Sequence, residues 1–233
     1  MSDFSQAFAD ALGLLQQADS GLIEIVVLSL QVSGSAVLLA ALIGLPLGAL
    51  IAIGRFPGRG VLSVIVNGFM GLPPVVVGLM VFLMLSRSGP LGVLGLLYTP
   101  SAMIVAQAIL VTPILAAYTA EVVRAEATRL MPSLTAMGLG RGQAARTLLY
   151  EGRYALVTGM LAGFGRAIAE VGAVMIVGGN IDHATRTMTT AIALETGRGN
   201  LALALALGMV LIALTLIVNA LAGGIFGPLR QRA

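Results

Sequence analysis

The 233-residue sequence contains no cysteine, no tryptophan and no lysine, and His183 is its only histidine. The absence of cysteine excludes disulfides and thiolate metal sites. The absence of lysine excludes a Walker-type phosphate loop and a Schiff base, because both need a lysine amine. One histidine cannot form a multi-histidine zinc or haem site within one chain. We therefore expect no catalytic residues, no metal site, no cofactor bound by this chain and no ATP hydrolysis through a phosphate loop of its own.

Charge is also scarce in this sequence. Only 10% of the residues are charged, 58% are hydrophobic and the mean hydropathy is +1.01, whereas soluble domains carry about a quarter charged residues. All 13 basic residues are arginines that lie between long apolar runs, which indicates membrane topology rather than a nucleic-acid-binding face. We predict an all-α, polytopic membrane helical bundle.

Five apolar segments are long enough to cross a bilayer, which takes about 20 helical residues. They are residues 25–54, 60–86, 101–120, 154–178 and 200–226. The predicted division of the chain is an extracytoplasmic N-terminal segment over 1–24, a transmembrane domain over 25–229 with a cytoplasmic loop at 121–153, and a cytoplasmic tail at 230–233. The N-terminal segment is read either as a surface-lying amphipathic helix or as a frayed tail.

The distribution of arginine predicts which loops face the cytoplasm. Loops on one side of the five segments hold nine arginines and those on the other side hold three. The positive-inside rule assigns the richer side to the cytoplasm. The N-terminus is therefore predicted outside and the C-terminus inside.

The second apolar segment is interrupted by Gly71, Leu72, Pro73 and Pro74. Two consecutive prolines remove two amide donors, so the helix must bend or break there. Within a bilayer such backbone is tolerated only where protein or water satisfies it. Pro73 and Pro74 are therefore candidates for a translocation path, with a packing kink between helices as the alternative.

The fourth segment carries two charges, Arg166 and Glu170, four residues apart. On one helix they share a face and can pair. Charged side chains at bilayer depth usually face protein or a pathway, because their insertion costs about 3 kcal/mol. We interpret the two residues as part of the translocation path or gate. A neutralised pair that braces the bundle is the structural alternative.

A hydroxyl-rich stretch follows the fourth segment on the predicted outer side. It contains Asn180, Arg186, Thr187, Thr189 and Thr190. Hydroxyls, exposed amides and an arginine are donors suited to a tetrahedral oxyanion. Asn180 is a candidate path residue and the three threonines are candidate anion contacts, whereas a solvated loop without a ligand explains the same residues.

The long cytoplasmic loop places Pro132 at a position suited to the first turn of a helix. We predict a short helix from Pro132 to Met137 that carries Leu134 and Met137 on one side and is ended by the glycines that follow. A projecting, partly apolar helix of this kind fits a groove on a partner protein. A helix held on lipid headgroups by Arg141 and Arg146 is the alternative.

This loop resembles the cytoplasmic coupling loop of ABC importer permeases, whose pattern is Glu-Ala-Ala, three residues, Gly and later Ile-x-Leu-Pro. Gly138 matches the glycine, but Pro132 takes the place of the glutamate and LLYEGRYAL replaces the Leu-Pro ending. The resemblance implies a docking helix without the contact of the usual glutamate. Its candidate residues are Pro132, Leu134, Met137, Gly138 and Arg141.

Four further stretches resemble the tungstate branch of the molybdate, tungstate and sulfate permeases. They are GLPPVVVGL at 71–79, SRSGPLGVLGLLYTPSAMIVAQ at 86–107, GFGRAIAEVGAVMIVGGNI at 163–181 and TRTMTTAIALETGRG at 185–199. The combination of GRAIAEVGA with GGNI is typical of the oxyanion group, and the Arg-Thr-Met-Thr-Thr run favours tungstate.

The resemblance implies a type I importer permease of a bacterial cell (inner) membrane that forms a homodimer. It also implies two cytoplasmic ATPase subunits that bind ATP and magnesium and an oxyanion-binding protein outside. ATP-driven movement of the helix near 132–142 would open a path for the anion by alternating access. Molybdate or sulfate is the alternative substrate. A stand-alone channel or ion-coupled carrier, with Arg166 and Glu170 as the coupling site, is the alternative mechanism. An intramembrane hydrolase is disfavoured because no GxSxG occurs and His183 falls in an outer loop.

Overall fold

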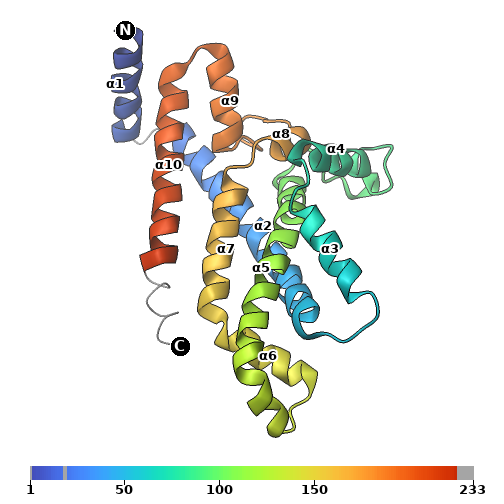
Figure 1. Ribbon diagram of the computed structural model, residues 1–233. Helices are drawn as coiled ribbons and strands as arrows, with labels where there is room; N and C mark the ends of the chain where they lie inside the picture. The colour runs from blue at the N-terminus through green and yellow to red at the C-terminus, as the bar shows by residue number, and fades with distance from the viewer. Residues whose placement is uncertain (1, 18–19, 225–233) are drawn as a thin grey trace. The chain divides into compact units, whose positions relative to one another are not determined.

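The structure, a computed structural model, describes residues 2–17 and 20–224, and Figure 1 shows their helices in chain order. The helices are α1 (Ser2–Gln17), α2 (Ser20–Ile53), α3 (Arg59–Phe69), α4 (Pro74–Leu85), the 3-10 turn η1 (Gly92–Leu94), α5 (Pro100–Ala136), α6 (Arg141–Glu151), α7 (Arg153–Ile168), α8 (Gly172–Gly178), α9 (Met188–Arg198) and α10 (Leu201–Gly224). No strand occurs in the described residues, so the all-α prediction is confirmed there.

The chain divides into two compact units. Unit 1 comprises Met1–Ala36, Pro73–Gln107 and Ala167–Ile217, and unit 2 comprises Val37–Leu72, Ala108–Arg166 and Val218–Ala233. Helices α2, α5, α7 and α10 contribute residues to both units. The candidate anion contacts therefore belong to unit 1, and the predicted coupling loop belongs to unit 2.

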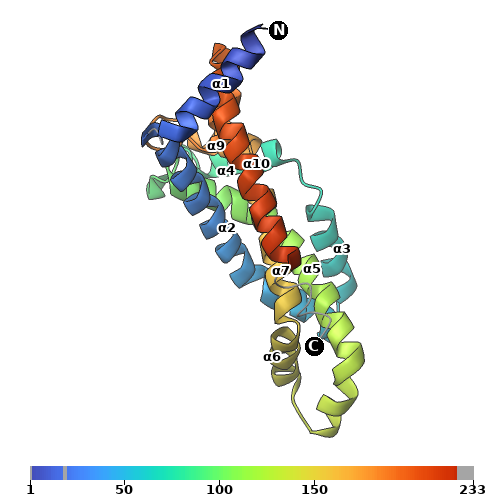
Figure 2. The ribbon, with the colours of Figure 1, turned by 90° about the vertical axis from the view of Figure 1, so that its left-hand side faces the viewer.

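Three described helices, α2, α5 and α10, are long and apolar enough to cross a membrane on their own, and Figure 2 shows the long α10 in front of the other helices. Two pairs, α3 with α4 and α7 with α8, meet the same criterion only when each pair is taken as one interrupted span. The five predicted segments fall on these helices, although α2 begins at Ser20, before the predicted start. The number of crossings and their direction stay predictions, and the predicted tail at 230–233 lies outside the described residues.

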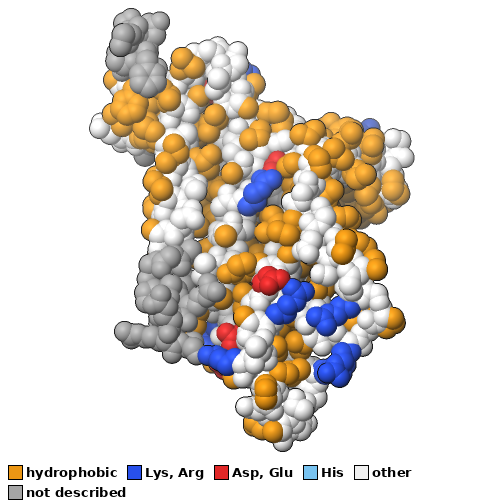
Figure 3. Space-filling model, viewed as in Figure 1, with side chains coloured by type: hydrophobic (Ala, Val, Ile, Leu, Met, Phe, Trp, Pro, Cys, Tyr) orange, Lys and Arg blue, Asp and Glu red, His pale blue; other side chains and the backbone are white. Residues whose placement is uncertain are grey.

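Large apolar side chains cover much of the face shown in Figure 3. Leu42 is 74% exposed, Val64 is 71% exposed and Leu216 is 64% exposed. Soluble monomers rarely expose contiguous apolar patches of this extent. A lipid environment explains the exposed side chains, because hydrocarbon chains are as apolar as leucine.

Within unit 2, α2 and α5 approach each other at backbone distance. A Cβ on Gly48 would lie 2.4 Å from the carbonyl oxygen of Ala116 and 2.6 Å from the Cβ of Thr119. Gly44, one turn earlier, faces the Cβ of Leu115 in the same way, at 3.1 Å. Two glycines four residues apart are the small-residue spacing that lets membrane helices pack closely.

Within unit 1, α4 packs on α8 at similarly short range. A Cβ on Gly78 would lie 2.7 Å from the Cα of Ala173. Ala173 and the neighbouring Val174 are fully buried, at 0% and 1% exposure. The small residue on each helix therefore sets the distance at which the two short helices meet.

The end of α2 is fixed by Arg59, the first residue of α3. Its Nε donates to the carbonyl oxygen of Ile51 at 2.6 Å and its Nη2 donates to that of Ala52 at 2.7 Å. A cation that binds the last carbonyls of a helix satisfies acceptors that have no partner inside the helix and favours the negative end of the helix dipole. The turn between α2 and α3 is held by these bonds.

Candidate functional site

The predicted restart of the chain at Pro132 is wrong. Helix α5 runs from Pro100 to Ala136 with Pro132 inside it, and α6 begins only at Arg141 (Figure 1). Proline has a helical φ and removes a single amide donor, so a helix close to its end can continue through it. The loop therefore forms a helical hairpin, called here the α5–α6 hairpin (residues 121–151), whose turn is visible in Figure 2.

Gly138 makes the turn of the α5–α6 hairpin. Its φ is 72°, in the left-handed region that glycine adopts without strain. Its N–H donates to the carbonyl oxygen of Thr135 at 3.0 Å, and the N–H of Leu139 donates to that of Leu134 at 3.1 Å. These bonds end α5. Gly138, which matches the glycine of the coupling-loop pattern, therefore has a structural role at a helix end.

Leu134 and Met137 do not lie on the same exposed side, contrary to the prediction. Leu134 is 8% exposed and belongs to the hydrophobic cluster of unit 2 that includes Ala144 and Leu148 of α6. Met137 is 73% exposed. Leu134 therefore holds the two helices of the hairpin together, whereas Met137 and the exposed Arg141 are open to a partner.

The predicted interruption at the two prolines is confirmed. Helix α3 ends at Phe69 and α4 begins at Pro74, with Pro73 in an extended conformation as the residue before the helix. The carbonyl oxygen of Pro73 accepts from the N–H groups of Val76 and Val77, at 3.0 and 3.2 Å. Pro74 is tolerated because the first residue of a helix needs no amide donor. The role of the two prolines in a translocation path stays a prediction.

Arg166 and Glu170 do not share a helix, so the predicted common helix face is wrong. Helix α7 ends at Ile168 and α8 begins at Gly172. Two side chains favour the break. Gln107 donates its Nε2 to the carbonyl oxygen of Ala167 at 3.0 Å, and Glu170 Oε1 accepts from the N–H of Ala173 at 3.3 Å in the first turn of α8. A carboxylate at a helix start is stabilised by the helix dipole.

Glu170 is buried, at 6% exposure, and its backbone connects it to the threonine-rich segment. Thr189 Oγ1 donates to the carbonyl oxygen of Glu170 at 2.8 Å. The structure therefore brings together one candidate gate residue and one candidate anion contact that are 19 residues apart in the sequence. Buried polar groups of this kind need hydrogen-bond partners. The contact therefore holds the first turn of α9 against the break that precedes α8.

The three candidate anion contacts are buried around the start of α9. Thr187, Thr189 and Thr190 are 5%, 7% and 0% exposed. The N–H of Thr187 donates to Thr190 Oγ1 at 3.0 Å, and the hydroxyls of these two residues lie 3.1 Å apart. The hydroxyls therefore cap α9, and none of the three side chains lies on an open surface.

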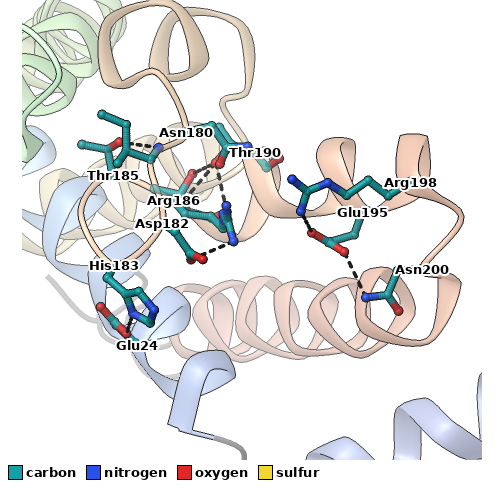
Figure 4. A network of polar contacts seen from close by, with 12 residues as sticks. Glu24, Asn180, Asp182, His183, Thr185, Arg186, Thr190, Glu195, Arg198 and Asn200 are labelled. Atoms are coloured by element: carbon teal, nitrogen blue, oxygen red, sulfur yellow. Dashed lines mark hydrogen bonds and ion pairs between the residues drawn. The ribbon is translucent and has the colours of Figure 1, made fainter.

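Asn180 lies beside this cluster in unit 1 (Figure 4). Its φ is 51°, its Nδ2 donates to the carbonyl oxygen of Thr190 at 3.4 Å, and its buried Oδ1 has no hydrogen-bond partner within the described residues. Thr185 closes the same loop, because its hydroxyl donates to the Gly178 carbonyl oxygen at 2.5 Å and accepts from the Ile181 N–H at 2.9 Å. Asn180 is thus the one candidate here with an unused acceptor.

Charged groups at the surface of the same loop pair with one another (Figure 4). Arg186 Nη1 lies 2.7 Å from Asp182 Oδ1, and His183 Nδ1 lies 2.7 Å from Glu24 Oε2 of α2. The hydrogen bond to Glu24, aided by its charge and that of Asp182, raises the pKa of His183 above the ordinary 6.5. One N–H group of Arg186, a predicted donor to an anion, is therefore engaged by a carboxylate, whereas its buried Nε has no hydrogen-bond partner within the described residues.

Two buried polar residues were missed by the sequence analysis. Gln107 is 3% exposed near the start of α5 and binds the end of α7, as described above, and its Oε1 has no partner within the described residues. Ser29 is 3% exposed in α2 and accepts from the N–H of Met188 at 2.8 Å. A polar side chain inside an otherwise apolar run was the signal available for both.

No metal centre is evident where the structure describes the chain. Among those residues no group of three or more His, Asp or Glu side chains is placed to hold a metal ion. The candidate residues provide hydrogen-bond donors, breaks in helices and an exposed hairpin. These features suit ligand binding and conformational change.

Comparison with known proteins identifies close relatives over most of the chain. A "Probable anion ABC transporter permease protein" of Haloferax volcanii is 45% identical over 205 residues, which cover 86% of this chain and 88% of the relative. "Tungstate uptake system permease protein TupB" of Peptoclostridium acidaminophilum is 38% identical and covers 94% of this chain and 96% of the relative. The protein of the same name in Campylobacter jejuni is 38% identical, with 91% and 89% covered.

More distant relatives and solved structures agree with this picture. Molybdenum and sulfate transport permeases of Escherichia coli are 26% and 27% identical. A chain of the inward-facing MetNI methionine ABC transporter superposes with a TM-score of 0.74 at 20% identity, over 89% of this chain and 95% of that one, which shows a shared fold. No family model matches the sequence.

Proposed function

The chain belongs to the permease family of ABC transporters, and from this premise we propose that it is the transmembrane subunit of an importer for tungstate. Permeases of this family are membrane-embedded transport components, and ATP hydrolysis belongs to a separate ATPase subunit. The observation that carries the proposal is the 38–45% identity, over most of the chain, to two tungstate uptake permeases and an anion permease. Molybdate is the second candidate, because a molybdenum permease is a more distant relative.

The proposed partners are two ATPase subunits that bind ATP and magnesium, a second copy of this chain and an extracytoplasmic oxyanion-binding protein. The exposed end of the α5–α6 hairpin, residues 135–143 and called here the hairpin tip, is the proposed contact with the ATPase. Met137 is exposed there, while Leu134 fixes the hairpin from inside. A rigid hairpin with an exposed end can transmit a displacement to the membrane helices that it continues.

The proposed gate lies in the helix breaks of unit 1. Pro73 directly precedes α4, and Glu170 lies two residues before Gly172, the first residue of α8. Helix α4 packs on α8 through Gly78. Interrupted membrane helices leave backbone groups that can bind an ion and change conformation. Asn180, with its unused buried acceptor, and the threonines that cap α9 are proposed to shape this region. Arg166, at the end of the unit 2 part of α7, is proposed as a gate residue by itself.

The test is reconstitution of the chain with its neighbouring-gene ATPase and binding protein in proteoliposomes. We expect ATP hydrolysis to be stimulated by the binding protein loaded with tungstate, and less by the same protein offered molybdate or sulfate. Equal stimulation by molybdate would replace tungstate as the assigned substrate. Failure of any ATPase to co-purify with the chain would contradict the permease assignment itself.

A further inference from the structure

A cavity of about 650 Å³ opens in unit 2, where the end of α2 faces the start of α6. Its walls include the apolar side chains of Leu50, Ile53 and Leu149. Leu50 is 49% exposed, so the apolar wall is open rather than sealed in a core. A cavity of this volume matches sites that hold a small organic molecule or part of a lipid chain.

Three arginines, Arg55, Arg141 and Arg146, line the same cavity, and no acidic residue lines it. In the part of the chain that the structure describes, none of the three forms an ion pair. Other arginines of the chain do pair with carboxylates: Arg124 with Glu121 and Arg198 with Glu195 are examples. The cavity therefore combines an apolar wall with three cations that lack a counter-charge.

The cavity lies at the point where an apolar helix ends. Helix α2 contains a stretch of mean hydropathy 2.6 and ends at Ile53, two residues before Arg55. The bonds from Arg59 to the last carbonyls of α2 hold this turn in place. Arginines at the end of a membrane helix lie at the level of the lipid headgroups. Figure 3 shows several basic side chains on the lower part of this face, with acidic side chains beside some of them.

We propose that this cavity binds an anionic phospholipid of the membrane that surrounds the chain. The phosphate accepts hydrogen bonds from Arg55, Arg141 and Arg146, and an acyl chain lies along Leu50 and Ile53. Guanidinium groups bind phosphate through paired N–H donors, and basic pockets between membrane helices bind such headgroups. A free oxyanion would leave the apolar wall uncovered, and a neutral lipid would leave three cations without a counter-charge. The inference does not depend on which anion is transported.

The experiment measures lipid retention by the full-length chain in native mass spectrometry. The purified chain is exchanged into micelles that contain phosphatidylglycerol or phosphatidylcholine. We expect retention of phosphatidylglycerol over phosphatidylcholine. The triple variant R55Q/R141Q/R146Q should lose roughly a hundredfold of that retention, the scale set by three basic residues near an anionic surface. Arg87→Gln, which removes an exposed arginine outside the cavity, is the matched control and should retain the lipid.

A second variant keeps the test independent of charge and of folding. Leu50→Trp fills the apolar wall without removing a cation and should reduce retention of phosphatidylglycerol while the melting temperature is unchanged. Equal retention of both lipids by the unmodified chain, or unchanged retention in the triple variant, would overturn the proposal. Displacement of the lipid by inorganic phosphate or tungstate would also overturn it, because the cavity would then bind a free oxyanion. Loss of ATPase co-purification in the triple variant with lipid retention intact would overturn it too, because the three arginines would then bind a protein partner.

Discussion

His183 and Glu24 join two distant segments of unit 1 through a single charge-assisted hydrogen bond of 2.7 Å. We predict that the pKa of His183 lies above 6.5 in the folded protein, because the carboxylate of Glu24 accepts from and attracts the imidazolium. Since His183 is the only histidine, one imidazole signal in an NMR titration of the labelled chain measures it. Glu24→Gln should lower the pKa, whereas an unchanged pKa in that variant would contradict the pairing.

The sign of the pH effect follows from the direction of that shift. A histidine whose pKa is raised on folding stabilises the folded state fully below its unfolded pKa, and the contribution is lost as pH rises through the folded value. The melting temperature of the chain should therefore fall as pH is raised through the region just above 6.5. The Glu24→Gln variant should lack this fall, and an equal fall in both proteins would assign it to other groups.

Thr190 caps α9 from inside unit 1 with no exposed surface. Thr190→Val keeps the shape of the side chain but leaves the N–H of Thr187 without its acceptor, which we expect to cost about 1–3 kcal/mol of unfolding free energy. Thermal unfolding in detergent measures the loss, and Thr190→Ser, which keeps the hydroxyl, is the control. A variant that melts normally but no longer transports the anion would instead support direct anion contact.

At this scale the sequence predicted some features and missed others for definite reasons. The break at Pro73 and Pro74 was predictable because proline acts on its own backbone. The helix end between Arg166 and Glu170 was not predictable, because the break between α7 and α8 is stabilised by Gln107 of another helix. Spacing within one segment carries no information about such a partner.

Among the helices, the close contact of α2 with α5 depends on Gly48. A Cβ at this position would lie 2.4 Å from the carbonyl oxygen of Ala116, a backbone atom that cannot rotate away. We expect Gly48→Ala to destabilise the chain by about 1–3 kcal/mol through overpacking. Gly34→Ala on the same helix is the matched control, since nothing lies within 4 Å of its added Cβ. Equal melting temperatures for the two variants would show that the helices do not pack this closely.

A second prediction for the helices concerns the role of the α5–α6 hairpin in coupling to the ATPase. Met137→Asp places a charge on the exposed hairpin tip and should abolish transport-coupled ATP hydrolysis without changing the melting temperature, because the side chain is 73% exposed. Val93→Asp, at a residue that is 99% exposed outside the hairpin, should leave coupling intact. Normal coupled turnover in the Met137 variant would remove the hairpin tip from the ATPase contact.

The hairpin also shows where sequence reasoning about elements stopped short. Gly138 was recognised as a helix end, and its φ of 72° bears this out. The local sequence at Pro132 predicts a helix start, whereas α5 continues through it to Ala136. The continuation is supported by burial of Leu134 against Ala144 and Leu148 of α6, and a contact made by the following helix overrides the local preference of a proline.

For the whole molecule, the sequence composition predicts a membrane protein, because 10% charged residues are too few to cover the surface of a soluble protein of 233 residues. The all-α architecture followed from the long apolar runs. The family required the comparison with relatives of 38–45% identity, which agrees with the resemblance of the loop and of the fourth segment. Closed helix ends, capped helix starts and glycine contacts then explain why this sequence adopts the shared fold.

We propose that this chain is a transport path without its own source of energy. The most direct measurement is tungstate accumulation in proteoliposomes that contain the chain alone, or the chain with its ATPase and binding protein. We predict uphill accumulation only when all three components and ATP are present, and none when the ATPase is omitted. Uphill accumulation by the chain alone, driven by an ion gradient, would contradict the account.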